Sequence, residues 1–223
     1  MKLSEKLYEY SKDIWDEYLK HPFILEMAYN TLDVEKYKYY MIQDYLYIKD
    51  YIKIFAEIIL KSDNLNDIEF LIQNMSNLLE ETLRVHIPYM KELGITEYEI
   101  KKSIPVKENT SYTHYMLFKS ATENELSGFV LLLNCSWSYA YIAENIINNH
   151  PEAAKSGLYS RWFNSYNSHE YKKTNYSLIN KVDIFSEKID SHDIEKLCKI
   201  FRRCSEYELD FWNMAYKYTK KKS

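Results

Sequence analysis

Apolar residues recur at helical spacing along most of the chain, with breaks at prolines, glycines and short runs of Ser, Asp and Asn. This pattern predicts helices over residues 3–20, 33–61, 65–92, 96–102, 111–122, 125–149, 152–165, 168–189 and 192–219. The connections between them are short. The sequence therefore predicts a single all-α domain over residues 1–223, a helical bundle of about eight to ten helices.

Local signals set the boundaries of these helices. His21-Pro22-Phe23 ends the first, because the residue before a proline avoids the helical conformation. Asp33 stands where it can cap the second. Pro88 is expected to kink the third or to end it early. Gly94 occupies the position at which helices commonly terminate, and residues 103–110 are expected to form a loop.

The composition excludes several kinds of site. The glycines stand only at positions 94, 128 and 157, so neither a dinucleotide-binding GxGxxG nor a P-loop can be formed. A net charge of −4 gives no basic face for a nucleic acid. The three cysteines form no CxxC, and none of the six histidines follows a glutamate by three residues. Neither a metal site nor a nucleic-acid partner is expected.

The chain also lacks the signals of export or of a membrane. Its first residues form an amphipathic pattern without an apolar core segment, which is unlike a signal peptide. The best apolar run, residues 129–133, is too short to span a bilayer. We therefore expect a cytoplasmic protein with no membrane partner.

Two acids and one cysteine interrupt the apolar faces of the longest predicted helices. Asp44 lies on the apolar stripe of the 33–61 helix, Glu208 on that of the last helix, and Cys135 on that of the 125–149 helix. A buried acid is costly unless it is hydrogen-bonded, so one interpretation is structural, with each acid bound to a tyrosine or tryptophan and Cys135 simply packed. The other is a cavity inside the bundle that binds a small, flat heteroaromatic ligand.

A haem site is a further alternative, because haem requires an axial ligand and His21 at a helix end is the best candidate for one. The competing interpretation of His21 is a local polar contact before Pro22.

Six segments, in order along nearly the whole chain, resemble the TenA family of aminopyrimidine aminohydrolases, also called thiaminase II. The three longest matches are YYMIQDYLY at 39–47, CSWSY at 135–139 and YELDFWNMAY at 207–216. HPF at 21–23, SYT at 111–113 and WFNSY at 162–166 also match. The resemblance implies the haem-oxygenase-like all-α fold, a homotetramer, and no haem, metal or other cofactor.

The resemblance also implies a role for each candidate residue. Cys135 is the nucleophile and Glu208 is the acid/base group. Asp44 is an ionised carboxylate that accepts a hydrogen bond from the 4-amino group of a pyrimidine substrate. The remaining pocket residues are tyrosines that bind the ring: Tyr47, Tyr112, Tyr139 and Tyr166. The implied activity is hydrolysis of 4-amino-5-aminomethyl-2-methylpyrimidine, or of thiamin, to 4-amino-5-hydroxymethyl-2-methylpyrimidine in thiamin salvage, by covalent addition of the thiol to the ring.

Two departures from the family pattern bear on substrate choice more than on fold. Asn134 stands where the family often has proline, and Ala143 where it often has glycine. The same site residues serve the aminopyrimidine and thiamin, so the sequence leaves the main substrate open. A non-catalytic pyrimidine-binding, thiamin-binding or regulatory protein on the same fold is the alternative function.

Overall fold

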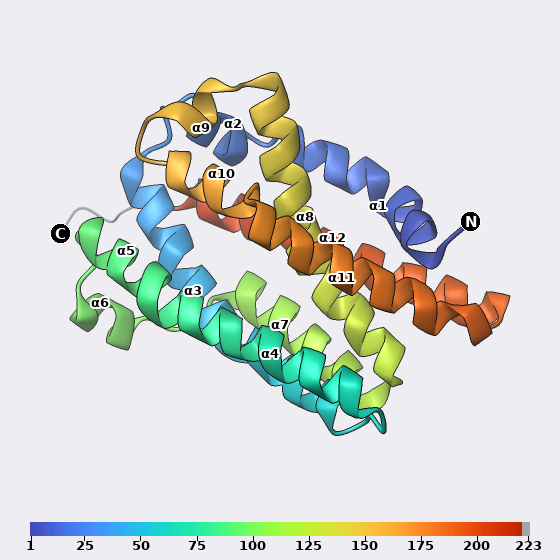
Figure 1. Ribbon diagram of the computed structural model, residues 1–223. Helices are drawn as coiled ribbons and strands as arrows, with labels where there is room; N and C mark the ends of the chain where they lie inside the picture. The colour runs from blue at the N-terminus through green and yellow to red at the C-terminus, as the bar shows by residue number, and fades with distance from the viewer. Residues whose placement is uncertain (220–223) are drawn as a thin grey trace. The chain divides into compact units, whose positions relative to one another are not determined.

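The computed structural model describes residues 1–219, except for the side chain of Lys188, and in this range it contains helices and no strand (Figure 1). The chain divides into two compact units. Unit 1 comprises Met1–Leu32 and Phe129–Asn213, and unit 2 comprises Asp33–Gly128 and the residues from Met214 on. The all-α prediction is confirmed, whereas a single domain over residues 1–223 stays a prediction.

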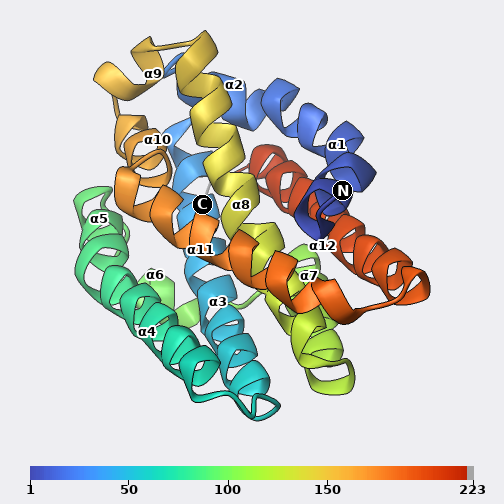
Figure 2. The same ribbon diagram turned by 45° about the vertical axis from the view of Figure 1, so that its right-hand side comes forward.

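Unit 1 is built from the two ends of the sequence. Its elements are α1 (Leu3–Lys20), α2 (Pro22–Ala28), α8 (Glu125–Asn149) from Phe129 on, α9 (Glu152–Lys155), α10 (Ser160–Tyr166), α11 (His169–Phe185), a 3-10 turn η2 (Ser186–Lys188) and α12 (Ser191–Lys217) as far as Asn213. α1 and α12 lie side by side (Figure 2). Arg202 of α12 binds the carboxylate of Asp13 in α1 through two nitrogens, at 2.6 and 2.8 Å.

Inside unit 1, a buried hydrogen-bond network joins α1, α8 and α12. The indole Nε1 of Trp15 and the amide Nδ2 of Asn134 both donate to Ser205 Oγ, at 2.9 and 2.8 Å. The Tyr18 hydroxyl donates to the Ser205 carbonyl at 2.6 Å, and Asn134 Nδ2 also lies 2.9 Å from the Phe201 carbonyl oxygen. Because these groups are buried, each lost bond would leave a polar atom unsatisfied. The network therefore holds the register of the three helices.

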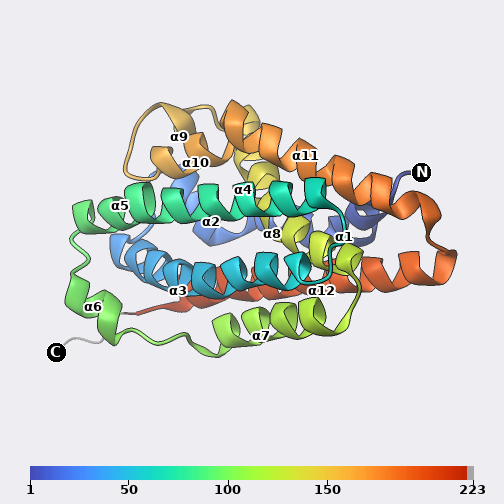
Figure 3. The same ribbon diagram turned by 60° about the horizontal axis from the view of Figure 1, so that its bottom comes forward.

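Unit 2 surrounds one long helix. Its elements are α3 (Val34–Ile59), α4 (Leu65–Glu81), a π-helical turn η1 (Thr82–His86), α5 (Ile87–Glu92), α6 (Glu97–Lys102), α7 (Lys107–Thr122), the first turn of α8 and the end of α12 from Met214 on. α3 packs against α4, α5 and α7, and α4 runs through η1 into α5 as one rod (Figure 3). Gln43 of α3 donates to the Ile104 carbonyl and accepts from the Val106 amide, so it ties the loop before α7 to α3.

Several of the predicted boundaries are confirmed. α1 and α8 match the predicted ranges 3–20 and 125–149. The Asp33 side chain accepts a hydrogen bond from the Glu35 amide at 2.9 Å and so caps α3. Gly94 has a φ of +79° just beyond α5, which is the conformation that favours glycine at a helix end.

Other boundaries were wrong, so the described residues hold twelve α-helices instead of eight to ten. α2 is a helix that the pattern did not predict, because Pro22 indicates the end of the first helix, whereas a proline is also favoured in the first turn of a helix. The predicted 152–165 helix divides into α9 and α10 at Gly157, whose φ is +111°. α7 begins at Lys107, inside the predicted loop. The helix does not end at Pro88 but continues through it, after the π-helical turn.

One described helix, α8, is long and apolar enough to pass a length-and-composition test for a membrane span, with a mean hydropathy of 1.3 over its best window. The run 129–133 is only the most apolar part of this helix, so the expectation that no segment could span a bilayer underestimated its apolar length. In the structure, 78% of that window is buried in the protein. Burial of this extent is typical of the core helix of a bundle.

Candidate functional site

In unit 1, the candidate thiol and the candidate acid lie near one tyrosine. Cys135 is half-buried, whereas Cys198 and Cys204 are buried, so Cys135 is the most exposed of the three cysteines. Glu208 on α12 is only 2% exposed. Burial raises the pKa of Tyr18 well above its ordinary value, and the charges of Glu208, Cys204 and Cys135 raise it further, in that order. Such effects require proximity. The Tyr18 hydroxyl therefore lies within electrostatic range of Glu208 and of both cysteines.

The buried network described above fixes the register of α8 and α12, the helices that carry Cys135 and Glu208. Asn134 directly precedes Cys135, and Ser205 lies about one turn before Glu208 on α12. The 2.8 Å bond from Asn134 to Ser205 thus joins α8 to α12 next to both candidate residues. A proline at position 134, as the family often has, could not donate these side-chain bonds. The departure at Asn134 therefore has a structural role in this chain.

The candidate tyrosines of unit 1 belong to an aromatic cluster. The rings of Tyr139 and Tyr166 lie 4.8 Å apart, centroid to centroid. Trp162 and Trp212 also belong to this cluster, with ring centroids 5.6 and 5.4 Å from that of Tyr139. The two tryptophans interrupt no apolar stripe and so were not candidates, although both stand within the segments that resemble the family. These tilted ring contacts form an aromatic cluster that begins one helical turn after Cys135.

Unit 2 brings its three candidates together on α3 and α7. The ring of Tyr47 lies 5.1 Å from that of Tyr112 and 5.6 Å from that of Tyr51, and its hydroxyl donates to Met116 Sδ at 3.4 Å. Asp44 stands one turn before Tyr47 on α3 and is 6% exposed. Unit 2 thus carries a buried acid one helical turn from a group of tyrosine rings in contact.

Asp44 is not the fully ionised carboxylate that the sequence led us to expect. Burial raises the pKa of Asp44 to about 7, with a further contribution from the negative charge of Glu81. Near neutral pH its protonated and ionised forms therefore coexist. The nearest basic group is His86, whose Nδ1 is 3.7 Å from Asp44 Oδ2. His86 was not selected from the sequence, because its distance from Asp44 depends on how the η1 turn packs against α3.

The seven predicted residues thus form two sets. Unit 1 carries Cys135, Tyr139, Tyr166 and Glu208, and unit 2 carries Asp44, Tyr47 and Tyr112. Each set is assembled within its own unit. That all seven line one cavity stays a prediction.

His21, the candidate haem ligand, makes the local contact that was its alternative interpretation. Its Nδ1 accepts a hydrogen bond from the Phe23 amide at 3.2 Å and so caps α2. Across residues 1–219, no three His, Cys, Asp or Glu side chains are grouped so that they could hold a metal ion.

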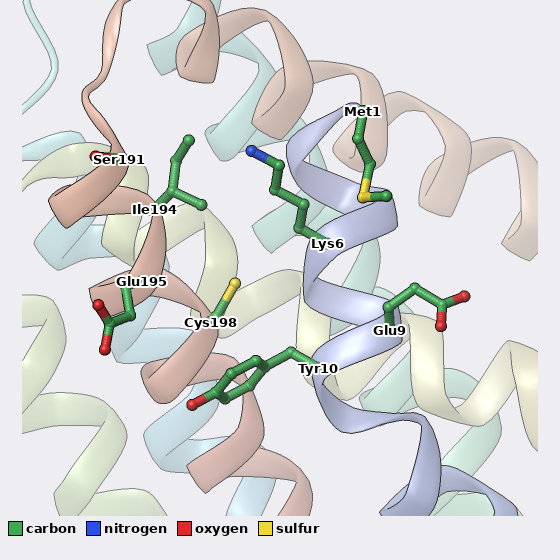
Figure 4. A pocket seen from close by; sticks show the side chains of 8 residues that line it. All are labelled: Met1, Lys6, Glu9, Tyr10, Ser191, Ile194, Glu195 and Cys198. Atoms are coloured by element: carbon green, nitrogen blue, oxygen red, sulfur yellow. The ribbon is translucent and has the colours of Figure 1, made fainter.

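A surface pocket of about 480 Å³ lies between α1 and α12 (Figure 4). None of the seven candidate residues lines it. Its lining consists of Met1, Lys6, Glu9, Tyr10, Ser191, Ile194, Glu195 and Cys198. Burial raises the pKa of the Cys198 thiol, which makes that thiol a poor nucleophile.

Known proteins resemble this chain in sequence and in fold. A relative from Helicobacter pylori named aminopyrimidine aminohydrolase is 34% identical over 97% of this chain and 99% of its own length. The solved structure of a TenA homologue protein from P. horikoshii OT3 has a TM-score of 0.87 at 28% identity, covering 97% of this chain and 99% of that one. A domain of unknown function with a heme oxygenase-like fold from Shewanella denitrificans OS217 has a TM-score of 0.76 at 17% identity, over 96% and 91% of the two chains, which supports the fold alone.

The haem-oxygenase-like all-α fold expected from the sequence is thereby confirmed. The sequence pattern of the TENA/THI-4/PQQC family matches residues 9–218, almost the whole chain. This protein therefore belongs to the TENA/THI-4/PQQC family.

Proposed function

We propose that the protein is an aminopyrimidine aminohydrolase of thiamin salvage. It hydrolyses 4-amino-5-aminomethyl-2-methylpyrimidine to 4-amino-5-hydroxymethyl-2-methylpyrimidine and ammonia. The observation that carries the proposal is that the half-buried Cys135 and the buried Glu208 lie in unit 1 within electrostatic range of the same tyrosine, Tyr18. The full-length similarity to a relative named for this activity supports it.

The reaction has two halves, and Cys135 serves both. In the first, the Cys135 thiolate adds to C6 of the pyrimidine while Glu208 protonates a ring nitrogen. The loss of aromaticity then lets the ring expel the protonated amine as ammonia, which leaves an exocyclic methylene. In the second, water adds to this methylene and gives up a proton to the released ammonia, the ring nitrogen returns its proton to Glu208, and the thiolate leaves as the ring regains its aromaticity. The net change is the exchange of an amine for a hydroxyl.

The other candidate residues bind the substrate. Asp44 accepts a hydrogen bond from the exocyclic 4-amino group, an interaction that fixes the orientation of the ring. Tyr47, Tyr112, Tyr139 and Tyr166 offer aromatic faces and hydroxyls to the flat heterocycle, and each stacked contact contributes about 0.5–1.5 kcal/mol. We also propose, from the family resemblance, that the protein works as a homotetramer in the cytoplasm.

Ammonia release from 4-amino-5-aminomethyl-2-methylpyrimidine, compared with thiazole release from thiamin, tests this function. We expect turnover of the aminopyrimidine, and the ratio of kcat/KM for the two compounds establishes which is the main substrate. Cys135→Ser in parallel excludes a contaminating enzyme. Folded protein that binds 4-amino-5-hydroxymethyl-2-methylpyrimidine but turns over neither compound would refute the proposal in favour of a non-catalytic binder.

A further inference from the structure

The π-helical turn η1 directs one histidine toward α3. Between α4 and α5 the chain takes one wide turn at Thr82–His86, where the Thr82 hydroxyl donates to the Leu78 carbonyl at 2.7 Å. π-helical turns inside helices are frequent at functional sites. At the end of this turn both ring nitrogens of His86 face α3, with Nε2 at 3.3 Å from the Met41 carbonyl oxygen and Nδ1 at 3.7 Å from Asp44 Oδ2.

These two contacts determine where the imidazole carries its hydrogen. A carbonyl oxygen only accepts hydrogen bonds, so Nε2 must be the protonated nitrogen. Burial lowers the pKa of His86 to about 4, against the opposing effect of its bond to Met41, so the ring is neutral at physiological pH. A neutral imidazole with hydrogen on Nε2 has a bare lone pair on Nδ1. The nitrogen that faces Asp44 is therefore an acceptor.

An acceptor at this position complements a protonated carboxyl. When Asp44 is protonated, its hydroxyl is the donor that Nδ1 requires, and a small rotation of either side chain closes the 3.7 Å gap to a hydrogen bond. Committing the Oδ2 hydrogen to His86 leaves Oδ1 as a pure acceptor. Without His86, the carboxyl hydroxyl would be free to turn and donate elsewhere.

We propose that His86 is a positioning residue that makes Asp44 an acceptor only, so that the pocket selects a pyrimidine with a 4-amino group over one with a 4-oxo group. This inference rests on the proposed function, in which Asp44 contacts position 4 of the ring. A 4-amino group donates and satisfies Oδ1, whereas a 4-oxo group would oppose one acceptor with another. The selectivity thus comes from a residue that does not itself touch the ligand.

Two variants of His86 separate its two contacts. His86→Asn places an amide oxygen near the position of Nδ1 and so retains an acceptor for Asp44. His86→Gln reaches the position of Nε2, so it retains a donor for the Met41 carbonyl but loses the acceptor. If His86 acts only structurally, through Met41, His86→Gln should retain the wild-type selectivity better than His86→Asn. If His86 orients the proton of Asp44, His86→Asn should retain the selectivity better.

The measurement is binding of 4-amino-5-hydroxymethyl-2-methylpyrimidine and of its 4-oxo analogue, followed by titration calorimetry at about pH 6 and about pH 8.5. At the lower pH, we expect His86→Gln to narrow the ratio of the two dissociation constants by about tenfold, the usual effect of exchanging one hydrogen bond, and His86→Asn to restore most of it. At the higher pH, Asp44 is ionised and accepts in every variant, so the difference between the variants should shrink.

Other titratable groups facing Asp44 must be the same in every variant for this comparison. They are Glu81 at the end of α4, which raises the pKa of Asp44, and Tyr37 on α3, whose own pKa is raised chiefly by burial and slightly by Asp44. None of the substitutions replaces either group. A pH effect confined to the glutamine variant is therefore assigned to the contact between positions 86 and 44.

Each outcome decides the proposal. An unchanged ratio in His86→Gln, with wild type binding the 4-amino compound, overturns the role of His86 and leaves the proposed hydrolase standing. Wild type that binds neither compound overturns both. If His86→Gln does not fold, wild type alone decides: its preference for the 4-amino compound should persist from about pH 6 to about pH 8.5, and loss of that preference at the lower pH overturns the proposal.

Discussion

Stability as a function of pH tests the protonation of Asp44 and His86 without any ligand. The pKa of Asp44 is raised in the folded protein, to about 7, and that of His86 is lowered, to about 4. Between about pH 4 and 6.5, folding therefore moves one proton from the histidine of the unfolded chain to the aspartic acid of the native one. The two effects on stability have opposite signs in this interval and cancel in the wild-type protein.

The signs and magnitudes follow from proton linkage. Asp44 binds more protons folded than unfolded, so its stabilising contribution is complete below pH 4 and is lost as the pH rises to about 7, at about 1.4 kcal/mol per pH unit and about 4 kcal/mol in all. His86 binds fewer protons when folded, so its contribution is complete above about pH 6.5 and is lost toward pH 4, about 3 kcal/mol in all. Burial is the largest cause of each shift, so the direction of each shift survives replacement of the neighbouring residue.

Urea denaturation at several pH values between about 5 and 6 measures these slopes. Relative to wild type, Asp44→Asn should gain about 1.4 kcal/mol of unfolding free energy per pH unit, and His86→Gln should lose about as much. The double variant should run parallel to wild type, which controls for the other ionisable groups. If Asp44→Asn ran parallel to wild type instead, Asp44 would be ionised in the folded protein and the reasoning about its proton would be refuted.

Three further substitutions test the packing that positions the candidate residues, each by the shift of its urea midpoint. Ser205→Ala leaves the buried Trp15 indole and Asn134 amide without their shared acceptor and should lower the free energy of unfolding by about 1–3 kcal/mol. Its control is Ser177→Ala, which removes an exposed hydroxyl bonded to the Lys173 carbonyl and should change the free energy of unfolding little. Gly157→Ala should cost about 1–2 kcal/mol, because φ is +111° there and the added Cβ would lie 2.7 Å from Asn30 Oδ1; an unchanged midpoint would show that the turn between α9 and α10 is not strained. Gly128→Ala should cost about 1–3 kcal/mol by overlap with Ile58, and Ile58→Ala in the same chain should cost less than the sum of the two single changes.

The helical fold could be predicted from the sequence because its signals are local. α1 and α8 follow from apolar spacing bounded by clear breaks, and the Asp33 cap from one residue type at one position. The helix α2 was missed because a proline can have either of two local effects on a helix. Pro22 could end one helix or begin the next, and the chain takes both options within two residues.

The candidate residues were predictable where they broke a pattern. Asp44, Glu208 and Cys135 stand out on apolar stripes, and the family resemblance selects the same three. His86 breaks no pattern, because a histidine near the end of an amphipathic helix is ordinary. Its role depends on the π-helical turn and on a distance of 3.7 Å across helices, neither of which residue spacing encodes. The proton on Asp44 follows from burial, which the stripe indicated, but its pKa required the packed structure.

The central claim is that Cys135 is the nucleophile of an aminopyrimidine hydrolase. Its most direct test is the rate of ammonia release from 4-amino-5-aminomethyl-2-methylpyrimidine by Cys135→Ser beside Cys198→Ser, a matched loss of a buried thiol that lies outside the candidate set. We predict that Cys198→Ser retains turnover, whereas Cys135→Ser loses it and still binds 4-amino-5-hydroxymethyl-2-methylpyrimidine. Turnover by Cys135→Ser at the wild-type rate would contradict the account.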